Sequence, residues 1–176
     1  MLIKTIFAGF GGQGVLSMGL NLAQAAMLEG KYVTFLPAYG AEVRGGTANC
    51  TVAISDEDIA SPVASSPDFI VAMNKPSMVR FQNQIESGGI FFLNSSLIDA
   101  EISRGDIDIA HIPASKIAED LGNTRSANMV MLGAFTRKTN MVSLDSVIEG
   151  LKSILQNKQK LIAINEKALH AGYELV

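Results

Sequence analysis

Short apolar runs alternate with helical patterns in the first part of this 176-residue chain. Residues 2–8 form an apolar run typical of a buried strand, and residues 32–36 form a second one. Between them, residues 15–28 carry apolar side chains at helical spacing, and Gly30 is a stop signal. The residues that recur at this spacing, as the apolar stripe of a helix does, are Leu16, Leu20, Ala23 and Met27. The pattern therefore predicts a strand, a helix and a strand in succession.

The same alternation continues through the middle of the chain. Residues 49–55 alternate like a strand and end at an acidic turn, residues 56–58. Asn74 is placed to cap a helix that runs toward Ile85, with Pro76 in its first turn. Further strands are predicted over residues 69–73, 90–93 and 107–112. This order predicts an α/β fold, doubly wound and Rossmann-like, with a largely parallel sheet and helices on both faces.

The last third of the chain is predicted to be helical. Residues 126–136 are apolar nearly all round, which is typical of a helix in the core or covered by a partner. Residues 144–155 form an amphipathic stripe with Ser143 as the expected cap, and a third helix is predicted over residues 161–172.

Composition and charge narrow the class of protein. The length fits one domain, and the net charge of −3, without a basic cluster, gives no reason to expect a nucleic-acid partner. A single cysteine, Cys50, excludes a disulfide framework and a cysteine-held metal or iron–sulfur site, and an inert buried thiol is expected there. No apolar run reaches the roughly 18 residues of a membrane span, and no signal segment is seen. A soluble cytoplasmic protein is therefore predicted.

A glycine-rich segment joins the first predicted strand to the first predicted helix. It contains Gly9, Gly11, Gly12, Gln13 and Gly14. A strand, a glycine turn and a helix leave backbone N–H groups free at a helix N-terminus, where phosphate or another anion can bind. The alternative is that the glycines only permit a tight turn and close packing.

Two common phosphate motifs do not fit this segment. The spacing of Gly9, Gly11 and Gly14 matches the dinucleotide fingerprint, but no acid follows the second strand, where residues 37–39 are Pro-Ala-Tyr. The kinase-like P-loop needs a lysine after its last glycine, and Val15 stands there. Two interpretations of this segment remain: a loop that binds a diphosphate-bearing ligand, or a loop that docks on another protein.

A second candidate segment follows the second strand and contains Tyr39, Arg44, Gly45 and Gly46. Arginine beside two glycines suits an anion, because the guanidinium offers a planar fork and glycines allow close backbone approach. Alternatively, Arg44 pairs with Glu42 or with another subunit, and Tyr39 either stacks on a ring or covers the edge of the sheet. Loops at the carboxyl ends of neighbouring parallel strands share a crevice, so the two segments should be neighbours.

No catalytic machinery is recognisable in the sequence. The two histidines, His111 and His170, have no cysteine or acid at metal-ligand spacing, and no serine-nucleophile elbow occurs. No catalytic residue and no metal ligand is therefore assigned, and the chain is interpreted as a binding module.

With these motifs in view, the chain resembles the gamma subunits of 2-oxoacid:ferredoxin oxidoreductases. The resemblance covers essentially all of residues 1–176, as a single gamma-type domain. It is carried by residues 9–15, by residues 39–46, and by Pro67-Asp68 leading to residues 72–77, and the first two of these motifs are specific when taken together. Residues 94–96 and 128–134 give weaker support.

The resemblance implies a role within a larger enzyme. That family oxidatively decarboxylates a 2-oxoacid to an acyl-coenzyme A and reduces ferredoxin, with thiamine diphosphate and iron–sulfur clusters held by partner subunits. The implied partners are the alpha and beta subunits, with a delta subunit as a further candidate, and coenzyme A is the implied ligand of residues 9–14 and 44–46. The motif variants favour a 2-oxoglutarate or branched-chain 2-oxoacid.

Three alternatives stay open at this point: an indolepyruvate oxidoreductase subunit, an independent dinucleotide-dependent oxidoreductase, and a purely structural module. Self-association of the isolated chain as a homodimer is also open.

Overall fold

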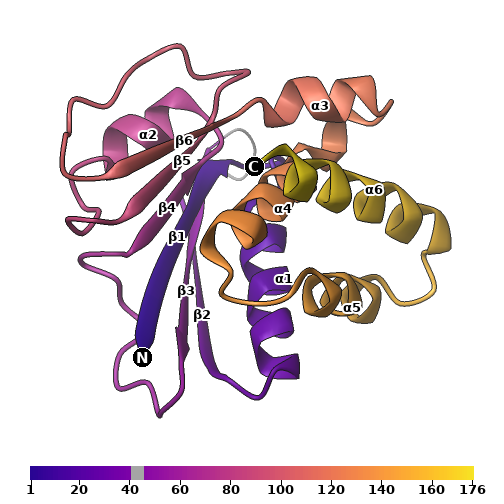
Figure 1. Ribbon diagram of the computed structural model, residues 1–176, viewed down its shortest axis with the longest axis horizontal. Helices are drawn as coiled ribbons and strands as arrows, with labels where there is room; N and C mark the ends of the chain where they lie inside the picture. Colours follow the sequence, from indigo (N-terminus) through magenta and orange to yellow (C-terminus); the bar gives the residue numbers. More distant parts are fainter. Residues whose placement is uncertain (41–45) are drawn as a thin grey trace.

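The computed structural model describes residues 1–40 and 46–176 and is built on a six-stranded sheet in the order β2-β3-β1-β4-β5-β6 (Figure 1). The strands β1, β4, β5 and β6 run parallel to one another, whereas β3 is antiparallel to both of its neighbours, β1 and β2. The predicted α/β class and mostly parallel sheet are confirmed. The strands are β1 (Leu2–Phe10), β2 (Tyr32–Tyr39), β3 (Thr47–Ser55), β4 (Phe69–Ala72), β5 (Ile90–Asn94) and β6 (Asp108–Ile112).

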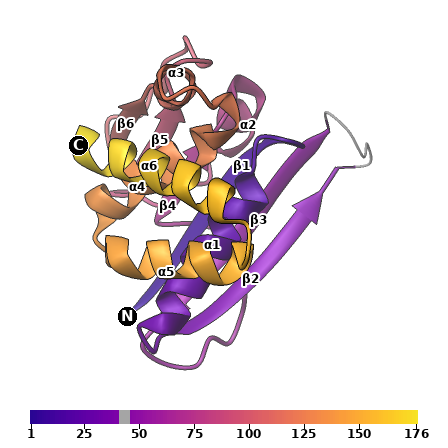
Figure 2. The same cartoon turned by 90° about the vertical axis from the view of Figure 1, so that its right-hand side faces the viewer.

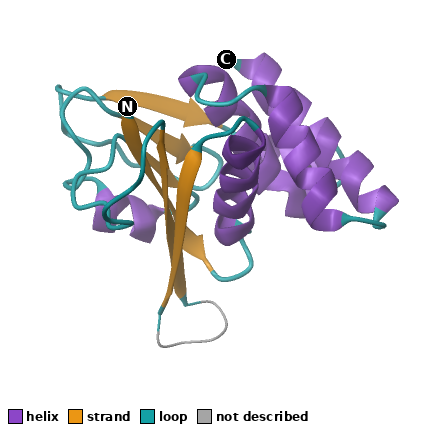
Figure 3. Ribbon diagram, turned by 90° about the horizontal axis from the view of Figure 1, so that it is seen from below, coloured by secondary structure: helices purple, strands orange, loops and turns teal. Residues whose placement is uncertain are grey.

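Helices cover both faces of the sheet. On one face lie α1 (Val15–Leu28), α4 (Ala127–Thr139), α5 (Leu144–Leu155) and α6 (Gln159–Leu175), and on the other lies α2 (Lys75–Phe81) (Figure 1). A short helix, α3 (Ala114–Asp120), and a 3₁₀ turn, η1 (Thr124–Ser126), connect β6 to α4. The hairpin of β2 and β3 extends past the helical layer (Figures 2 and 3).

The almost wholly apolar segment at residues 126–136 belongs to the core of the chain itself. Phe135 of α4 is fully buried, and its ring centroid lies 5.6 Å from that of Phe7, 5.7 Å from that of Phe69 and 5.1 Å from that of Phe92. These three partners come from β1, β4 and β5, so α4 lies across the middle of the sheet. Of the two predicted placements for this helix, burial in the core is the correct one.

The apolar stripe predicted for α1 is only partly buried: Ala23 is buried and Leu16 packs against the core, whereas the other two residues face outward. The bounds of the helix are as predicted, but Leu20 is 41% exposed and Met27 is 59% exposed. The buried side of the helix includes Gly19, where a side chain would collide with Cys50 of β3. The lack of a side chain at Gly19 lets α1 approach β3 closely, and Leu20 and Met27 of the predicted stripe point outward.

Other differences concern the lengths of two helices and the presence of a third. The helix that begins at Lys75 ends at Phe81, short of the predicted Ile85, although the Asn74 side chain caps it by accepting a 2.9 Å hydrogen bond from the Ser77 N–H. The last helix is longer than predicted, and α3 was not predicted at all. Among the described residues, no helix is long and apolar enough to cross a membrane.

Candidate functional site

The glycine segment forms a tight connection between the carboxyl end of β1 and α1. Gly12 (φ 96°) and Gly14 (φ 72°) have left-handed backbone conformations, which glycine adopts without strain. Gly14 stands at the N-cap of α1 and provides no capping side chain. Within the described part of the chain, the N–H groups of Val15, Leu16 and Ser17 have no backbone partner, as expected for a first helical turn. These N–H groups are available to an anion.

Gln13 fastens this loop to the neighbouring strand. Its Oε1 accepts hydrogen bonds of 2.7 Å from the Phe10 N–H and 2.7 Å from Nδ2 of Asn74, which follows β4. Its Nε2 donates to the Met73 carbonyl over 3.3 Å. The side chain of Gln13 therefore holds the loop in position and is not free to bind a ligand through Oε1.

The two glycine segments meet through their backbones. The Gly11 N–H donates a 2.9 Å hydrogen bond to the Gly46 carbonyl. The expected proximity is therefore present at Gly46, whereas Arg44 and Gly45 lie outside the described residues. The two segments are close for a different reason from the one expected, because β2 does not lie beside β1 in the sheet. The antiparallel strand β3 begins at Thr47, opposite Phe10, and brings the second segment to the first.

Gly9 has a different position from the rest of the segment. It is buried within β1, paired with Ala48 of β3, and a side chain there would collide with Gln13 and Val15. Its role in this structure is close packing beneath the loop.

Three hollows surround the start of α1, and the first lies beside Tyr39. Tyr39 is 73% exposed at the end of β2. This Tyr39 hollow has a volume of about 330 Å³ and is lined by Phe10, Gly11, Gly12, Gly14, Val15, Leu16, Ser17, Tyr39 and Ala48.

The second hollow lies between the carboxyl ends of β1 and β4. After these adjacent strands the chain leaves toward opposite faces of the sheet, which is the point where open α/β sheets bind ligands. Asn94 orients Ser115 here by donating to its Oγ over 2.9 Å. This switch-point hollow has a volume of about 170 Å³ and is lined by Gly12, Gln13, Met73, Ser115, Thr124, Arg125 and Ala127.

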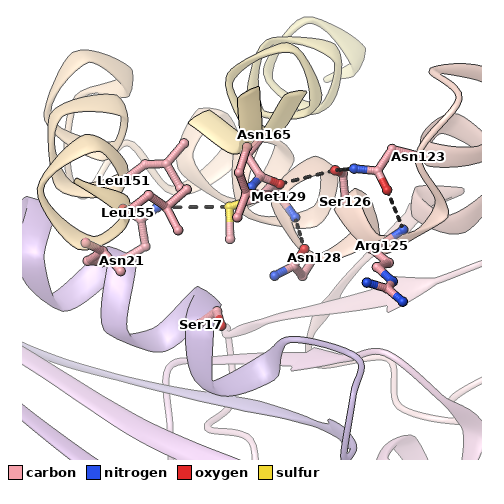
Figure 4. A pocket seen from close by; sticks show the side chains of 12 residues that line it. Ser17, Asn21, Asn123, Arg125, Ser126, Asn128, Met129, Leu151, Leu155 and Asn165 are labelled. Atoms are coloured by element: carbon pink, nitrogen blue, oxygen red, sulfur yellow. Dashed lines mark hydrogen bonds between the residues drawn. The ribbon is translucent and has the colours of Figure 1, made fainter. Parts of the chain in front are cut away.

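The third hollow lies between α1, α4, α5 and α6 (Figure 4). Asn128 forms part of its wall and donates from Nδ2 to the Gly14 carbonyl over 3.3 Å, which ties α4 to the glycine loop. We call it the amide cavity, because four asparagines lie on its wall. Its volume is about 330 Å³, and it is lined by Ser17, Asn21, Asn123, Arg125, Ser126, Asn128, Met129, Leu151, Ile154, Leu155, Leu161 and Asn165.

Arg125 and the asparagines of this cavity were not identified from the sequence as site residues. Asn128 was noted only as a weak part of the family resemblance. A polar run, Asn123-Thr124-Arg125-Ser126, directly before a helix whose residues 127–136 are buried is the signal that could have indicated them.

The described residues around the three hollows include no histidine and no reactive thiol. Burial raises the pKa of the Cys50 thiol to about 12, so this thiol is neutral and unreactive at ordinary pH. His111 and His170 are exposed and line none of the three hollows. Across residues 1–40 and 46–176, no cluster of three or more His, Cys, Asp or Glu could hold a metal ion.

The sheet order argues against the dinucleotide alternative. In a dinucleotide-binding fold the second strand lies beside the first, and its terminal acid holds the ribose. Here β3 separates β1 from β2, and β2 ends in Pro37, Ala38 and Tyr39. The match of the glycine spacing to that fingerprint is therefore not accompanied by the rest of the site.

Comparison with known proteins agrees with the resemblance seen in the motifs. The family model described as pyruvate ferredoxin/flavodoxin oxidoreductase matches residues 4–175. The ketoisovalerate oxidoreductase subunit VorA of Methanothermobacter thermautotrophicus is 44% identical over 174 residues, which are 98% of this chain. The chain spans only 36% of the length of that relative.

Two solved structures are similar over nearly the whole chain. The keto/oxoacid ferredoxin oxidoreductase gamma subunit of Geobacter sulfurreducens has a TM-score of 0.84 at 27% identity, covering 98% of this chain and 96% of that one. The 2-oxoglutarate:ferredoxin oxidoreductase of Magnetococcus marinus, solved with 2-oxoglutarate, coenzyme A and succinyl-CoA bound, has a TM-score of 0.90 at 28% identity. This match covers 99% of the present chain and 31% of the other.

Proposed function

The chain belongs to the pyruvate ferredoxin/flavodoxin oxidoreductase family, and on that basis we propose that it is the gamma-type domain of a 2-oxoacid:ferredoxin oxidoreductase. Its role is to help bind coenzyme A and to dock on the subunits that carry out the reaction. The enzyme oxidatively decarboxylates a 2-oxoacid, transfers the acyl group to coenzyme A and reduces ferredoxin.

One observation carries this proposal: directly after the glycine loop, Val15, Leu16 and Ser17 line a hollow and their backbone N–H groups have no backbone partner in the described part of the chain, while Gly11 joins the loop to Gly46. A glycine-lined surface at a helix N-terminus fits a diphosphate, which coenzyme A contains. Coenzyme A is bound in the Magnetococcus marinus enzyme, whose matching segment has this fold. Gly12, Gly14 and Gly46, with Tyr39, Arg44 and Gly45, are the proposed contacts.

The remaining cofactors belong to partner subunits in this proposal. With one cysteine, which is buried, the chain has no ligand set for an iron–sulfur cluster. Thiamine diphosphate and the clusters are therefore assigned to alpha, beta and delta subunits. The relatives favour ketoisovalerate or 2-oxoglutarate as the oxoacid, as their names state.

A charge placed at Gly12 tests the coenzyme site directly. A side chain there would enter open space, so Gly12→Asp and Gly12→Asn impose the same backbone strain and differ mainly in charge. In the assembled enzyme, we expect Gly12→Asp to raise the KM for coenzyme A about tenfold or more relative to Gly12→Asn, because a carboxylate repels phosphate. The KM for the 2-oxoacid should be the same in both.

Equal KM values for coenzyme A in the two variants would remove the loop from the coenzyme site. Purification of the chain from its native host without a subunit bearing thiamine diphosphate or iron–sulfur clusters would overturn the assignment to the enzyme itself.

A further inference from the structure

We propose that the amide cavity holds the nucleoside end of the coenzyme, with Arg125 as the partner of its 3′-phosphate. This inference rests on the proposed function, because it extends the diphosphate site at the glycine loop to the rest of the same ligand. It places recognition of the adenosine in the helical layer, between α1, α4, α5 and α6.

The three hollows are neighbours around the first turn of α1 and share residues of their walls. Ser17 lines both the amide cavity and the Tyr39 hollow, Arg125 lines both the amide cavity and the switch-point hollow, and Gly12 lines the other two together. A ligand whose diphosphate lies on the N–H groups of that turn therefore has an adjoining cavity on the α4 side. The volume of about 330 Å³ is within the range of pockets that hold drug-sized molecules.

Arg125 is the charged group of this surface. Among the described residues, Arg125 is the only charged side chain that lines any of the three hollows. No Asp or Glu of the described residues forms a salt bridge with it. Its backbone is held in η1 by the Asn123 Oδ1, which accepts from the Arg125 N–H over 3.3 Å. A guanidinium without a carboxylate partner, at the wall of two hollows, suits a phosphomonoester.

The two ends of the cavity differ in chemistry. Leu151 and Leu155 of α5 lie at one end, and Asn123 and Arg125 lie at the other (Figure 4). Asn165 lies between them, and its Oδ1 accepts from Ser126 Oγ over 3.1 Å, which leaves its NH₂ group for a ligand. Leucines with neighbouring amides suit a planar heterocycle, and a guanidinium at the far end suits an attached phosphate.

Asn21 supplies a separate sign that this wall is not shaped for stability alone. The residue is 1% exposed, and its Oδ1 has no hydrogen-bond partner. Its Nδ2 has only a 4.0 Å contact with the Met129 sulfur. Unpaired buried amides are unfavourable, and departures of this kind from good packing are expected where a site is built.

A comparison of coenzyme A with 3′-dephospho-coenzyme A tests this inference separately from the proposed function. The second compound lacks only the phosphate assigned to Arg125. Calorimetric titration of the assembled enzyme should show at least about tenfold tighter binding of coenzyme A, as expected for a charge-assisted hydrogen bond. Arg125→Ala should abolish that preference and leave the affinity for dephospho-coenzyme A unchanged. Arg80→Ala, an exposed arginine on α2 across the sheet, is the matched control and should behave as wild type.

A second variant reports on the cavity itself. Asn21→Leu should raise the melting temperature of the full chain, because it removes the unpaired amide, and should weaken binding of both coenzymes. A preference for coenzyme A that survives Arg125→Ala, or that is lost instead in Tyr39→Ala, would overturn the placement. If Gly12→Asp still weakens binding in that case, the proposed function stands and only this inference fails.

Discussion

The Gly11 N–H donates a 2.9 Å hydrogen bond to the carbonyl of Gly46, 35 positions further along the chain. This bond extends the antiparallel ladder of β1 and β3 by one step beyond the Phe10–Thr47 pair. It therefore connects the loop that precedes α1 to the loop that closes the β2–β3 hairpin.

The glycine loop is also fixed from its other side, and Gln13→Leu tests that contact. The substitution leaves the Phe10 N–H and the Asn74 amide without the acceptor that Gln13 provides at 2.7 Å. We expect a loss of about 1–3 kcal/mol in the free energy of unfolding, measured by urea denaturation.

Gln24→Leu is the matched control, because no side-chain hydrogen bond of Gln24 is found in the described part of the chain. It should change the free energy of unfolding by no more than about 0.5 kcal/mol. Equal losses in Gln13→Leu and Gln24→Leu would show that the Gln13 hydrogen bonds contribute nothing to stability.

The type of each element could be predicted from the sequence, whereas the pairing of the strands and the buried face of α1 could not. The bounds of α1 and the cap at Ser143 followed from spacing and capping chemistry, which are local. The exposure of Leu20 could not be predicted in this way, because α1 carries apolar residues around most of its circumference. Which face is buried depends on where β3 leaves room, at Gly19.

The candidate site shows the same division. The glycine loop was visible as a motif, and its meeting with Gly46 was expected, but for a reason that the sheet order does not support. The contact of Asn128 with Gly14 joins residues 114 positions apart and is created by the packing of α4 on α1. No local pattern contains that information, so the amide cavity could only be found in three dimensions.

The crossing of α4 and α6 makes a second prediction. A side chain at Gly133 would collide with the Leu169 carbonyl, and one at Gly172 would collide with the Val130 carbonyl. Backbone atoms cannot move aside as flexible side chains do, so Gly133→Ala and Gly172→Ala should each cost about 3 kcal/mol or more in the free energy of unfolding.

Gly105→Ala is the control for both, since a side chain there meets nothing within 4 Å and the backbone is not left-handed. It should be neutral or slightly stabilising in the same thermal and urea unfolding series. If Gly133→Ala or Gly172→Ala had the same free energy of unfolding as Gly105→Ala, α4 and α6 would not approach each other as closely as the structure shows.

Cys50 makes the chain sensitive to alkaline pH. Burial raises the pKa of its thiol from 9.0 to about 12, and its Sγ lies 3.5 Å from the Val15 carbonyl. Below pH 9 the thiol is neutral in both the folded and the unfolded chain, so it has no effect on the pH dependence. Between pH 9 and about 12 the unfolded chain loses this proton and the folded chain keeps it, which favours unfolding.

The wild-type chain should therefore lose more stability than Cys50→Ala as the pH rises through that window. The extra loss should be about 1.4 kcal/mol near pH 10, from the standard linkage relation. Urea unfolding of both proteins at several pH values, under reducing conditions, measures it, and the lysine and tyrosine titrations cancel in the difference. If the free energies of unfolding of the two proteins changed equally with pH, the thiol would ionise as easily in the folded chain as in the unfolded one. Cys50 of β3 would then not be buried beneath α1.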